Sequence, residues 1–359
     1  MLEVIYKAQR FMKEACRKLG RQINIMEVCG THTVSIFRNG IRATLPQSIK
    51  LLSGPGCPVC VTSQGYIDTV VELSARKNCL IATYGDMVRV PGKDGSLETK
   101  STNANIKVVL SSEEALTLAK RNPDKMVIFV AVGFETTAPA TAVVIKQACE
   151  EDIDNFCVLC AHKLVVPAMR TLLSAKNDKI DAFLCPGHVS VIIGYEAFSG
   201  IVEEFGRPCV VAGFEAIQIM EALAEICRQL SSGKAQLKSV YNAVVTRKGN
   251  ITAQKIIADY FETGNGHWRG LGNIEKSVLR LKKRYSKFDA FRRLGLEEKP
   301  GAEPAGCRCG EVICGLIEPV ECRLFATECT IDNPVGPCMV SSEGICAAWF
   351  KYGREDRRS

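Results

Sequence analysis

The sequence has no long apolar run and few aromatic residues, and both absences exclude whole classes of protein. No stretch reaches the roughly 18–20 apolar residues that a membrane-spanning helix requires. Residues 1–19 are amphipathic and lack the apolar core and small-residue cleavage site of a secretory signal. The chain has only two Trp and eight Tyr, which offer no visible platform for stacking bases. We therefore expect a cytoplasmic protein that works without a membrane or nucleic acid.

Glycine-rich phosphate loops are absent as well. Neither G-x-G-x-x-G nor G-x-x-x-x-G-K-[ST] follows any predicted strand, so nucleotide binding is not expected. The net charge of +7 is mild, and part of it comes from Lys and Arg residues clustered between positions 276 and 293. A basic stretch of this kind is usually a solvated helix face.

Cysteine, by contrast, is abundant. The chain has 18 cysteines among 359 residues, and in a long intracellular protein such a number indicates metal or redox chemistry rather than a disulfide framework. Many of them are still expected to be small buried hydrophobic residues, because they lie within apolar runs. This group comprises Cys79, Cys149, Cys157, Cys160, Cys209 and Cys227.

Eight short apolar runs alternate with helical segments. The runs cover residues 23–28, 49–52, 79–83, 106–110, 126–132, 156–159, 182–184 and 209–212. Continuous apolar runs are typical of parallel strands that are covered on both faces. We therefore expect an α/β protein with two parallel-sheet, Rossmann-like domains facing a cleft, followed by a helical and cysteine-rich region. The expected domain ranges are 1–120, 121–236 and 237–359.

Chemically active residues follow several of these runs. Cys29-Gly-Thr-His32 follows the first run, and Gly54-Pro-Gly-Cys57-Pro-Val-Cys60 follows the second. In the second expected domain, Gly-Phe-Glu occurs at 133–135 and 213–215, and Pro-Gly-His-Val-Ser occurs at 186–190. The carboxyl ends of parallel strands meet at one edge of a sheet, so these motifs should converge there.

Each motif admits more than one interpretation. Cys57 and Cys60 form a Cys-x-x-Cys motif, which is either a redox dithiol, half of a metal knuckle or two packed thiols. Cys29 and His32 are either metal ligands or a nucleophile and its base. Glu135 and Glu215 either serve a site or cap helices, and the motif around His188 can also be a simple turn.

The C-terminal tail contains seven more cysteines. They are Cys307, Cys309, Cys314, Cys322, Cys329, Cys338 and Cys346. The last four are widely spaced on Gly- and Pro-bearing backbone, and no histidine lies among them. This spacing favours a [4Fe–4S] cluster over structural zinc, which prefers tight knuckles, or over buried thiols and disulfides. The choice of four ligands stays open, because seven thiols are available.

Five sequence blocks together resemble the HypD family of [NiFe]-hydrogenase maturation factors. They are Cys-Gly-Thr-His-Thr at 29–33, Gly-Pro-Gly-Cys-Pro-Val-Cys at 54–60, Gly-Phe-Glu-Thr-Thr at 133–137, Pro-Gly-His-Val-Ser at 186–190 and Pro-Val-Gly-Pro-Cys-Met-Val-Ser-Ser-Glu-Gly at 334–344. The resemblance covers nearly the whole chain. It implies a scaffold on which the Fe(CN)2CO unit is assembled, in complex with the small protein HypC and with HypE as the source of cyanide.

The resemblance also implies roles for individual residues. Cys29 would ligate an Fe(II) ion that carries cyanide and CO, with Thr31 and His32 beside it. Cys57 and Cys60 would be a dithiol/disulfide pair. The [4Fe–4S] ligands would be Cys322, Cys329, Cys338 and Cys346. Cys314 is an extra thiol relative to the family pattern, as are Cys307 and Cys309 relative to this quartet.

Two other functions are compatible with the motifs. A stand-alone iron–sulfur thiol–disulfide oxidoreductase would use the cluster and the dithiol but leave Cys29 and His32 without a role. A zinc-stabilised α/β binding protein would use the tail alone. If the resemblance holds, the chain is an assembly scaffold with redox activity, and whether it is also an enzyme stays open.

Overall fold

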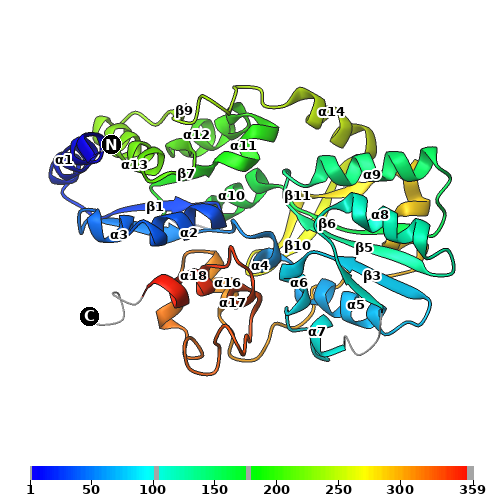
Figure 1. Ribbon diagram of the computed structural model, residues 1–359. Helices are drawn as coiled ribbons and strands as arrows, with labels where there is room; N and C mark the ends of the chain where they lie inside the picture. The colour runs from blue at the N-terminus through cyan, green and yellow to red at the C-terminus, as the bar shows by residue number, and fades with distance from the viewer. Residues whose placement is uncertain (1, 101–104, 175–178, 354–359) are drawn as a thin grey trace.

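The computed structural model describes residues 2–100, 105–174 and 179–353. Two α/β lobes lie side by side, each built around a parallel sheet, and the C-terminal region packs between them (Figure 1). This architecture confirms the expected fold class. Among the described residues, no helix combines the length and the apolar character that crossing a membrane requires.

The first lobe contains a five-stranded parallel sheet in the order β2-β1-β7-β8-β9. Its strands are β1 (Ile23–Glu27), β2 (Ile49–Ser53), β7 (Ala182–Pro186), β8 (Cys209–Ala212) and β9 (Leu237–Ser239). The second lobe contains a four-stranded parallel sheet in the order β4-β3-β5-β6. Its strands are β3 (Cys79–Thr83), β4 (Ile106–Val108), β5 (Met126–Gly133) and β6 (Phe156–His162).

The strand pairing corrects the expected grouping of the strands. Strands β1 and β2 pair with β7 and β8, whereas β3 and β4 share a sheet with β5 and β6. The chain therefore leaves the first lobe after β2, builds the second lobe and returns at β7. Each of the ranges 1–120 and 121–236 contributes strands to both lobes. Parallel neighbours are joined by long crossovers, so local sequence carries little signal about which strands pair.

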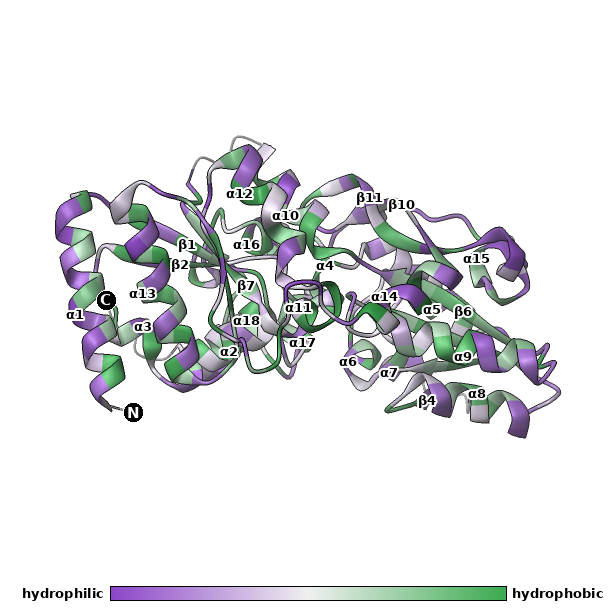
Figure 2. Ribbon diagram, turned by 90° about the horizontal axis from the view of Figure 1, so that it is seen from above, coloured by the Kyte–Doolittle hydropathy of each residue, from purple (hydrophilic) through white to green (hydrophobic). Residues whose placement is uncertain are grey.

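Both faces of the central strands are buried, which explains their continuous apolar runs, whereas the edge strand β4 is largely exposed. Figure 2 shows the apolar residues along these strands in green. Helices α1 (Leu2–Leu19) and α13 (Ala216–Ser232) cover the outer face of the first sheet. Helices α8 (Ser112–Arg121) and α9 (Ala138–Glu150) cover the outer face of the second. The inner faces share one core with α5 (Gln64–Ser74) and with the C-terminal region. This shared core joins the two lobes.

Residues 261–281 form an antiparallel hairpin, where the sequence led us to expect helix. The hairpin consists of β10 (Phe261–Trp268) and β11 (Gly272–Leu281), and only α14 (Ile251–Tyr260) before it is helical as expected. Frequent charged residues obscured the strand pattern, whereas Phe261, Leu279 and Leu281 are buried in the core of the second lobe. The basic residues of β11 therefore lie on a strand.

The tip of this hairpin is held by close backbone contacts. The backbone N–H of Arg269 donates to the Val61 carbonyl at 2.9 Å, at the end of helix α4 (Pro58–Val61). Gly270 has a φ of +74°, and a Cβ there would stand 2.5 Å from the carbonyl oxygen of Gly310. The tip therefore fits between α4 and the start of the tail only because Gly270 has no side chain.

The tail is built from short helices that pack against the loops of the first lobe. They are α16 (Cys309–Ile313), the 3-10 helix η3 (Pro319–Glu321), α17 (Pro337–Val340) and α18 (Ile345–Tyr352). Helices α16 and α17 contact α4, and α18 packs on α2 (Gly30–Arg38). Phe37 and Trp349 meet edge to face at that second contact, with ring centroids 5.2 Å apart.

Alanine substitutions at Gly270 and Gly272 test the hairpin contact. Both glycines have a φ near +74°, but nothing lies within 4 Å of a Cβ at Gly272. Gly272→Ala should cost about 1–2 kcal/mol of unfolding free energy from backbone strain alone. Gly270→Ala should cost about 1–3 kcal/mol more, because its methyl group meets the Gly310 backbone. Urea unfolding measures both, and equal losses would contradict the close contact.

Candidate functional site

Loops at the carboxyl ends of both sheets line one cleft of about 510 Å³. The strand order reverses between β1 and β7 in the first sheet and between β3 and β5 in the second. Ligands of open α/β sheets bind at such switch points. Cys29, Asp86, Phe134 and His188 follow these four strands, and all of them line the cleft. The two rims therefore face each other across it.

Cys29 brings a thiol to this cleft. It is the N-cap residue of α2 and is 8% exposed. The loop that carries Cys57 packs directly on it: the Gly30 N–H donates to the Gly56 carbonyl at 3.1 Å, and a Cβ on Gly56 would stand 2.4 Å from the Cys29 Cα. Only glycine fits at position 56, and its absence of a side chain brings the two cysteine loops together.

The surroundings of Cys29 keep its thiol protonated. Burial raises the pKa of Cys29 to about 12, and the nearby Glu343 carboxylate also raises it. Backbone and side-chain hydrogen bonds from Thr31 and His32 act in the opposite direction. The Thr31 hydroxyl also donates to Glu343 Oε1 at 2.5 Å. A metal ion that binds Cys29 must therefore displace a proton, and a carboxylate stands close by.

His32 does not line the cleft with Cys29, although the sequence places the two close together. It is fully buried, its Nε2 donates to the Gly213 carbonyl at 3.0 Å, and its Nδ1 has no hydrogen-bond partner. Burial lowers the pKa of His32 to about 4, so the ring is neutral. The ring of Phe214 packs against both His32 and His188, with centroids 4.8 Å and 4.0 Å away. His32 thus ties α2 to the end of β8.

Cys57 and Cys60 form a disulfide bond just behind the cleft wall. Cys57 caps α4, and its Sγ accepts a hydrogen bond from the Cys60 N–H at 3.2 Å. The two cysteines are only 2% and 1% exposed, whereas Pro58 and Val59 between them line the cleft. The disulfide is therefore sealed from solvent by the turn that contains it.

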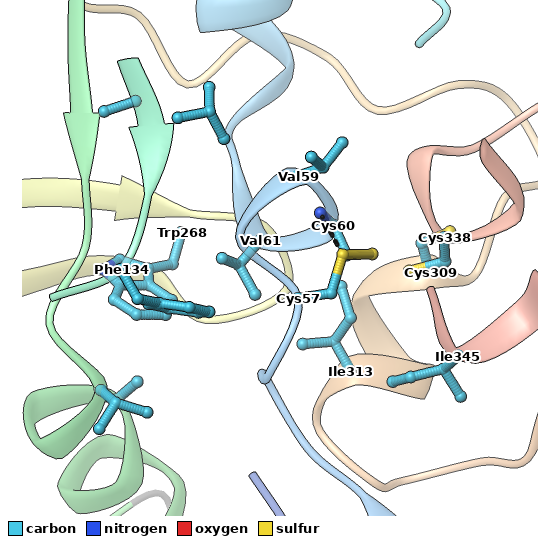
Figure 3. Close-up of a cluster of buried hydrophobic side chains, with 14 of the residues drawn as sticks. Cys57, Val59, Cys60, Val61, Phe134, Trp268, Cys309, Ile313, Cys338 and Ile345 are labelled. Atoms are coloured by element: carbon cyan, nitrogen blue, oxygen red, sulfur yellow. Dashed lines mark hydrogen bonds between the residues drawn. A yellow bond between two sulfur atoms is a disulfide. The ribbon is translucent and has the colours of Figure 1, made fainter. Parts of the chain in front are cut away.

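Tail thiols lie on the other side of this disulfide. Figure 3 shows Cys309 and Cys338 close together on one side of Cys57 and Cys60, with Trp268 on the other side. The contact arises because α16 and α17 pack on α4. The Cys309 thiol is within hydrogen-bonding reach of three other thiols, those of Cys307, Cys338 and Cys346.

Five tail cysteines line a small cavity of about 20 Å³. They are Cys307, Cys309, Cys322, Cys329 and Cys346. Together with Cys338, we call these residues the tail thiol cluster. Gly336 allows its tight packing, because a Cβ there would stand 2.6 Å from the Sγ atoms of both Cys307 and Cys309. The seventh cysteine, Cys314, instead donates from its Sγ to the Gly270 carbonyl at 3.4 Å.

The predicted cluster ligands agree with this geometry only in part. Cys322, Cys329 and Cys346 line the cavity, but Cys338 does not, whereas Cys307 and Cys309 do. Within residues 2–100, 105–174 and 179–353, no three His, Cys, Asp or Glu side chains stand in the arrangement of a formed metal site. The quartet of Cys322, Cys329, Cys338 and Cys346 therefore stays a prediction.

The two Gly-Phe-Glu carboxylates cap helices, which agrees with the capping alternative. Glu215 forms a capping box with Gln218 at the start of α13. Glu135 caps a helix distant in sequence, because its Oε1 accepts from the Val165 N–H at 2.9 Å at the start of α10 (Val165–Ser174). Its Oε2 has no partner, and burial raises the pKa of Glu135 to about 7.

His162 ends β6 and is sealed in the second lobe. Its Nε2 lies 2.9 Å from the Thr141 hydroxyl and its Nδ1 lies 3.4 Å from the Thr137 hydroxyl. Burial lowers the pKa of His162 to about 3, so this ring is neutral as well. His162 is therefore a structural residue of the second rim.

Sequence reasoning assigned no role to Glu343 or Asp86, yet both line the cleft. Asp86 accepts hydrogen bonds from the Ser341 hydroxyl at 2.8 Å and the Ser342 N–H at 3.0 Å. This contact holds the tail segment across the cleft, so that Glu343 lies beside Cys29. The polar Ser-Ser-Glu segment between two cysteines was the only signal available.

The site thus belongs to a two-lobed α/β protein with three groups of cysteines. A buried thiol lies at the cleft, a disulfide lies behind the cleft wall, and a cluster of thiols lies behind the disulfide. The model of the HypD family, described as "Hydrogenase formation hypA family", matches residues 3–353. The chain therefore belongs to the HypD family of hydrogenase maturation factors.

Curated relatives agree with this family over nearly their whole length. The hydrogenase maturation factor HypD of Azotobacter vinelandii is 42% identical over 356 residues, covering 97% of this chain and 93% of the relative. HypD of Escherichia coli is 42% identical and covers 94% and 91%, respectively. HypD of Cupriavidus necator is 41% identical and covers 93% and 91%.

Removing the charge of Glu343 should make Cys29 more reactive. The carboxylate raises the pKa of the Cys29 thiol, so Glu343→Gln should lower it and increase the thiolate fraction at a given pH. We expect Cys29 to be alkylated severalfold faster, as followed by mass spectrometry of its peptide. Glu343→Asp keeps the charge and is the matched control. Equal rates in Glu343→Gln and the wild type would contradict the electrostatic effect.

His162 should make folding stability depend on pH. Burial lowers the pKa of His162 in the folded state. Below about pH 6.5 the histidine is therefore protonated in the unfolded chain but stays neutral in the folded chain. Well below pH 6.5, the unfolding free energy of the wild type therefore falls by about 1.4 kcal/mol per pH unit. In urea unfolding, a less stable His162→Asn variant should therefore approach the wild type by about 1 kcal/mol between pH 6.5 and 5.5, because the unfolded histidine is already half protonated at pH 6.5. A gap that does not change with pH would contradict the assignment.

Proposed function

We propose that this chain is the platform on which the Fe(CN)2CO unit of [NiFe]-hydrogenases is assembled, together with HypC and with HypE as the cyanide donor. The observation that carries the proposal is the order of the thiols. Cys29 lines the cleft, the Cys57–Cys60 disulfide lies behind its wall, and the tail thiol cluster lies behind the disulfide. The chain is thus a scaffold with redox activity, and its product leaves with a partner.

Cys29 is the proposed iron ligand on the platform. A soft thiolate suits an Fe(II) ion that carries cyanide and CO, and the cleft of about 510 Å³ leaves room for that unit and for a partner's thiol. As iron binds, the Cys29 proton passes to the Glu343 carboxylate, which the Thr31 hydroxyl already holds in place. Burial then keeps the iron–sulfur bond away from solvent.

The Cys57–Cys60 pair is the proposed source of electrons for cyanide release. A protein thiocyanate, R–SCN, reacts with the two thiols to give R–SH, CN⁻, one proton and the disulfide. The thiocyanate gains two electrons as its S–CN bond breaks, and the dithiol loses two as its S–S bond forms. The disulfide in the structure corresponds to the oxidised state after this step.

The tail thiol cluster is the proposed site of a [4Fe–4S] cluster. Such a cluster takes four cysteine thiolates, and six thiols lie together here on short helices and irregular backbone. The predicted ligands are Cys322, Cys329, Cys338 and Cys346, and the cavity lining favours Cys307 or Cys309 in place of Cys338. When bound, it would pass electrons singly from an external donor to the disulfide, which takes up two electrons and two protons.

A stand-alone thiol–disulfide oxidoreductase fits the structure less well. The Cys57 and Cys60 side chains are almost fully buried, so an external disulfide cannot reach them without opening of the α4 turn. We also propose a cytoplasmic location, because the many unpaired thiols suit a reducing compartment.

Infrared spectroscopy of the chain purified with HypC tests the proposal, because iron-bound cyanide and CO absorb where protein is silent. The wild-type complex should show both sets of bands. Cys29→Ala should lose the iron unit and all of these bands. Cys60→Ala should keep the iron–sulfur absorption but lose the cyanide bands.

Cys185→Ala is the matched control, since Cys185 is buried on β7 within the shared core and has no proposed role. It should leave the bands unchanged. Full cyanide bands in Cys60→Ala would discard the electron route, and full bands in Cys29→Ala would discard the platform. Turnover of a small disulfide without any partner would support the oxidoreductase instead.

A further inference from the structure

Arg269 is a buried arginine, and two nitrogens of its guanidinium group have no hydrogen-bond partner among the described residues. It is 2% exposed, and its Nη2 donates to the Gln64 side-chain oxygen at 3.0 Å. Its Nε and Nη1 have no hydrogen-bond partner. The guanidinium therefore keeps a full positive charge in the core with most of its donors unused.

The position of Arg269 is set by the hairpin tip. Its backbone N–H is bonded to Val61 at the end of α4, and the next residue, Gly270, packs on the Gly310 backbone of α16. Its side chain thus starts between the helix that carries Cys60 and the helix that begins at Cys309. Gly310 directly follows Cys309, so the hairpin tip meets the tail thiol cluster at the start of α16.

A buried charge of this kind costs several kcal/mol unless an opposite charge or hydrogen bonds compensate it. Among the described residues, only the Gln64 side-chain oxygen accepts a hydrogen bond from this guanidinium. A cluster held by four thiolates carries net negative charge, and hydrogen bonds to its sulfur atoms are among the interactions that set its reduction potential. The unused donors of this buried positive charge fit such a neighbour.

We propose that Arg269 is the positioning residue that balances the charge of the iron–sulfur cluster and raises its reduction potential. This inference rests on the proposed function, because it requires a cluster in the tail. Reduction adds one negative charge to the cluster, so a fixed positive charge nearby favours the reduced form.

Arg308 provides an internal contrast. Arg308 lines the cavity of the tail thiol cluster, but its guanidinium pairs with both oxygens of Glu311, and its side chain is 38% exposed. Its charge is already compensated and screened by solvent, so it should influence the cluster little. Arg308→Gln is therefore the matched control for Arg269→Gln.

The test is a redox titration of the full chain after anaerobic reconstitution with iron and sulfide, followed by electron paramagnetic resonance. Arg269→Gln should shift the equilibrium towards the oxidised cluster by about tenfold or more, which is about 59 mV for a one-electron couple. Arg269→Lys keeps the charge and should shift it less. Arg308→Gln should match the wild type.

A second measurement separates this role from simple packing. Without iron, Arg269→Gln should unfold at the same urea concentration as the wild type or a higher one, because it removes a buried charge with unused hydrogen-bond donors. Cluster uptake should then raise the unfolding temperature less in the variant than in the wild type.

Each outcome decides between the two proposals. A wild-type chain that takes up no cluster would refute the iron–sulfur part of the proposed function. A wild-type cluster whose potential is unchanged in Arg269→Gln, or changed equally in Arg308→Gln, would overturn the role of Arg269 alone. A metal-free Arg269→Gln chain that fails to fold would overturn it too, since the arginine would then be a structural residue.

Discussion

The short helix α4 is the constraint on which the rest of the site depends, because three parts of the chain meet there. The loop before it lies against Cys29 only because Gly56 has no side chain. The hairpin tip docks on its last carbonyl, at Val61, and two tail helices pack on its flank. A single turn of helix thus joins the cleft, the hairpin and the tail thiol cluster, and any displacement of it would separate the thiols.

Burial sets the protonation state of the Cys29 thiol and the accessibility of the Cys57–Cys60 disulfide. Low-polarity surroundings raise the pKa of Cys29, so its thiol stays protonated until a metal ion replaces the proton. The same burial shields the disulfide of Cys57 and Cys60 from thiols in solution. Glu343 lies beside Cys29 on the cleft side, and Arg269 lies beside the tail on the other.

The sequence predicted the individual elements of the fold better than their arrangement. All eight predicted strands are present, because a strand buried on both faces requires a continuous apolar run. Their division between two sheets was predicted wrongly, since parallel pairing depends on crossovers that leave no local signal. The hairpin at 261–281 was missed because its apolar residues are separated by charged residues and glycines.

The sequence likewise predicted individual residues of the site better than the contacts between them. Cys29, Cys57 and Cys60 could be singled out because cysteines in Gly- and Pro-rich loops after apolar runs have a chemical meaning that the sequence alone carries. The roles of Glu343 and Arg269 could not, since only the fold places Glu343 in the cleft with Cys29 and sets the residue after Arg269 against Gly310 of the tail. Even His32, three residues after Cys29 in the sequence, bonds instead to the distant Gly213.

The sequence by itself therefore determined the class of fold, the family and the thiols available for chemistry, because apolar periodicity and residue type are local properties. Only the tertiary structure decided which strands share a sheet, which thiols lie together and which charges face them. These features depend on contacts between residues that are hundreds of positions apart, and such contacts form only when the two lobes and the tail pack around α4.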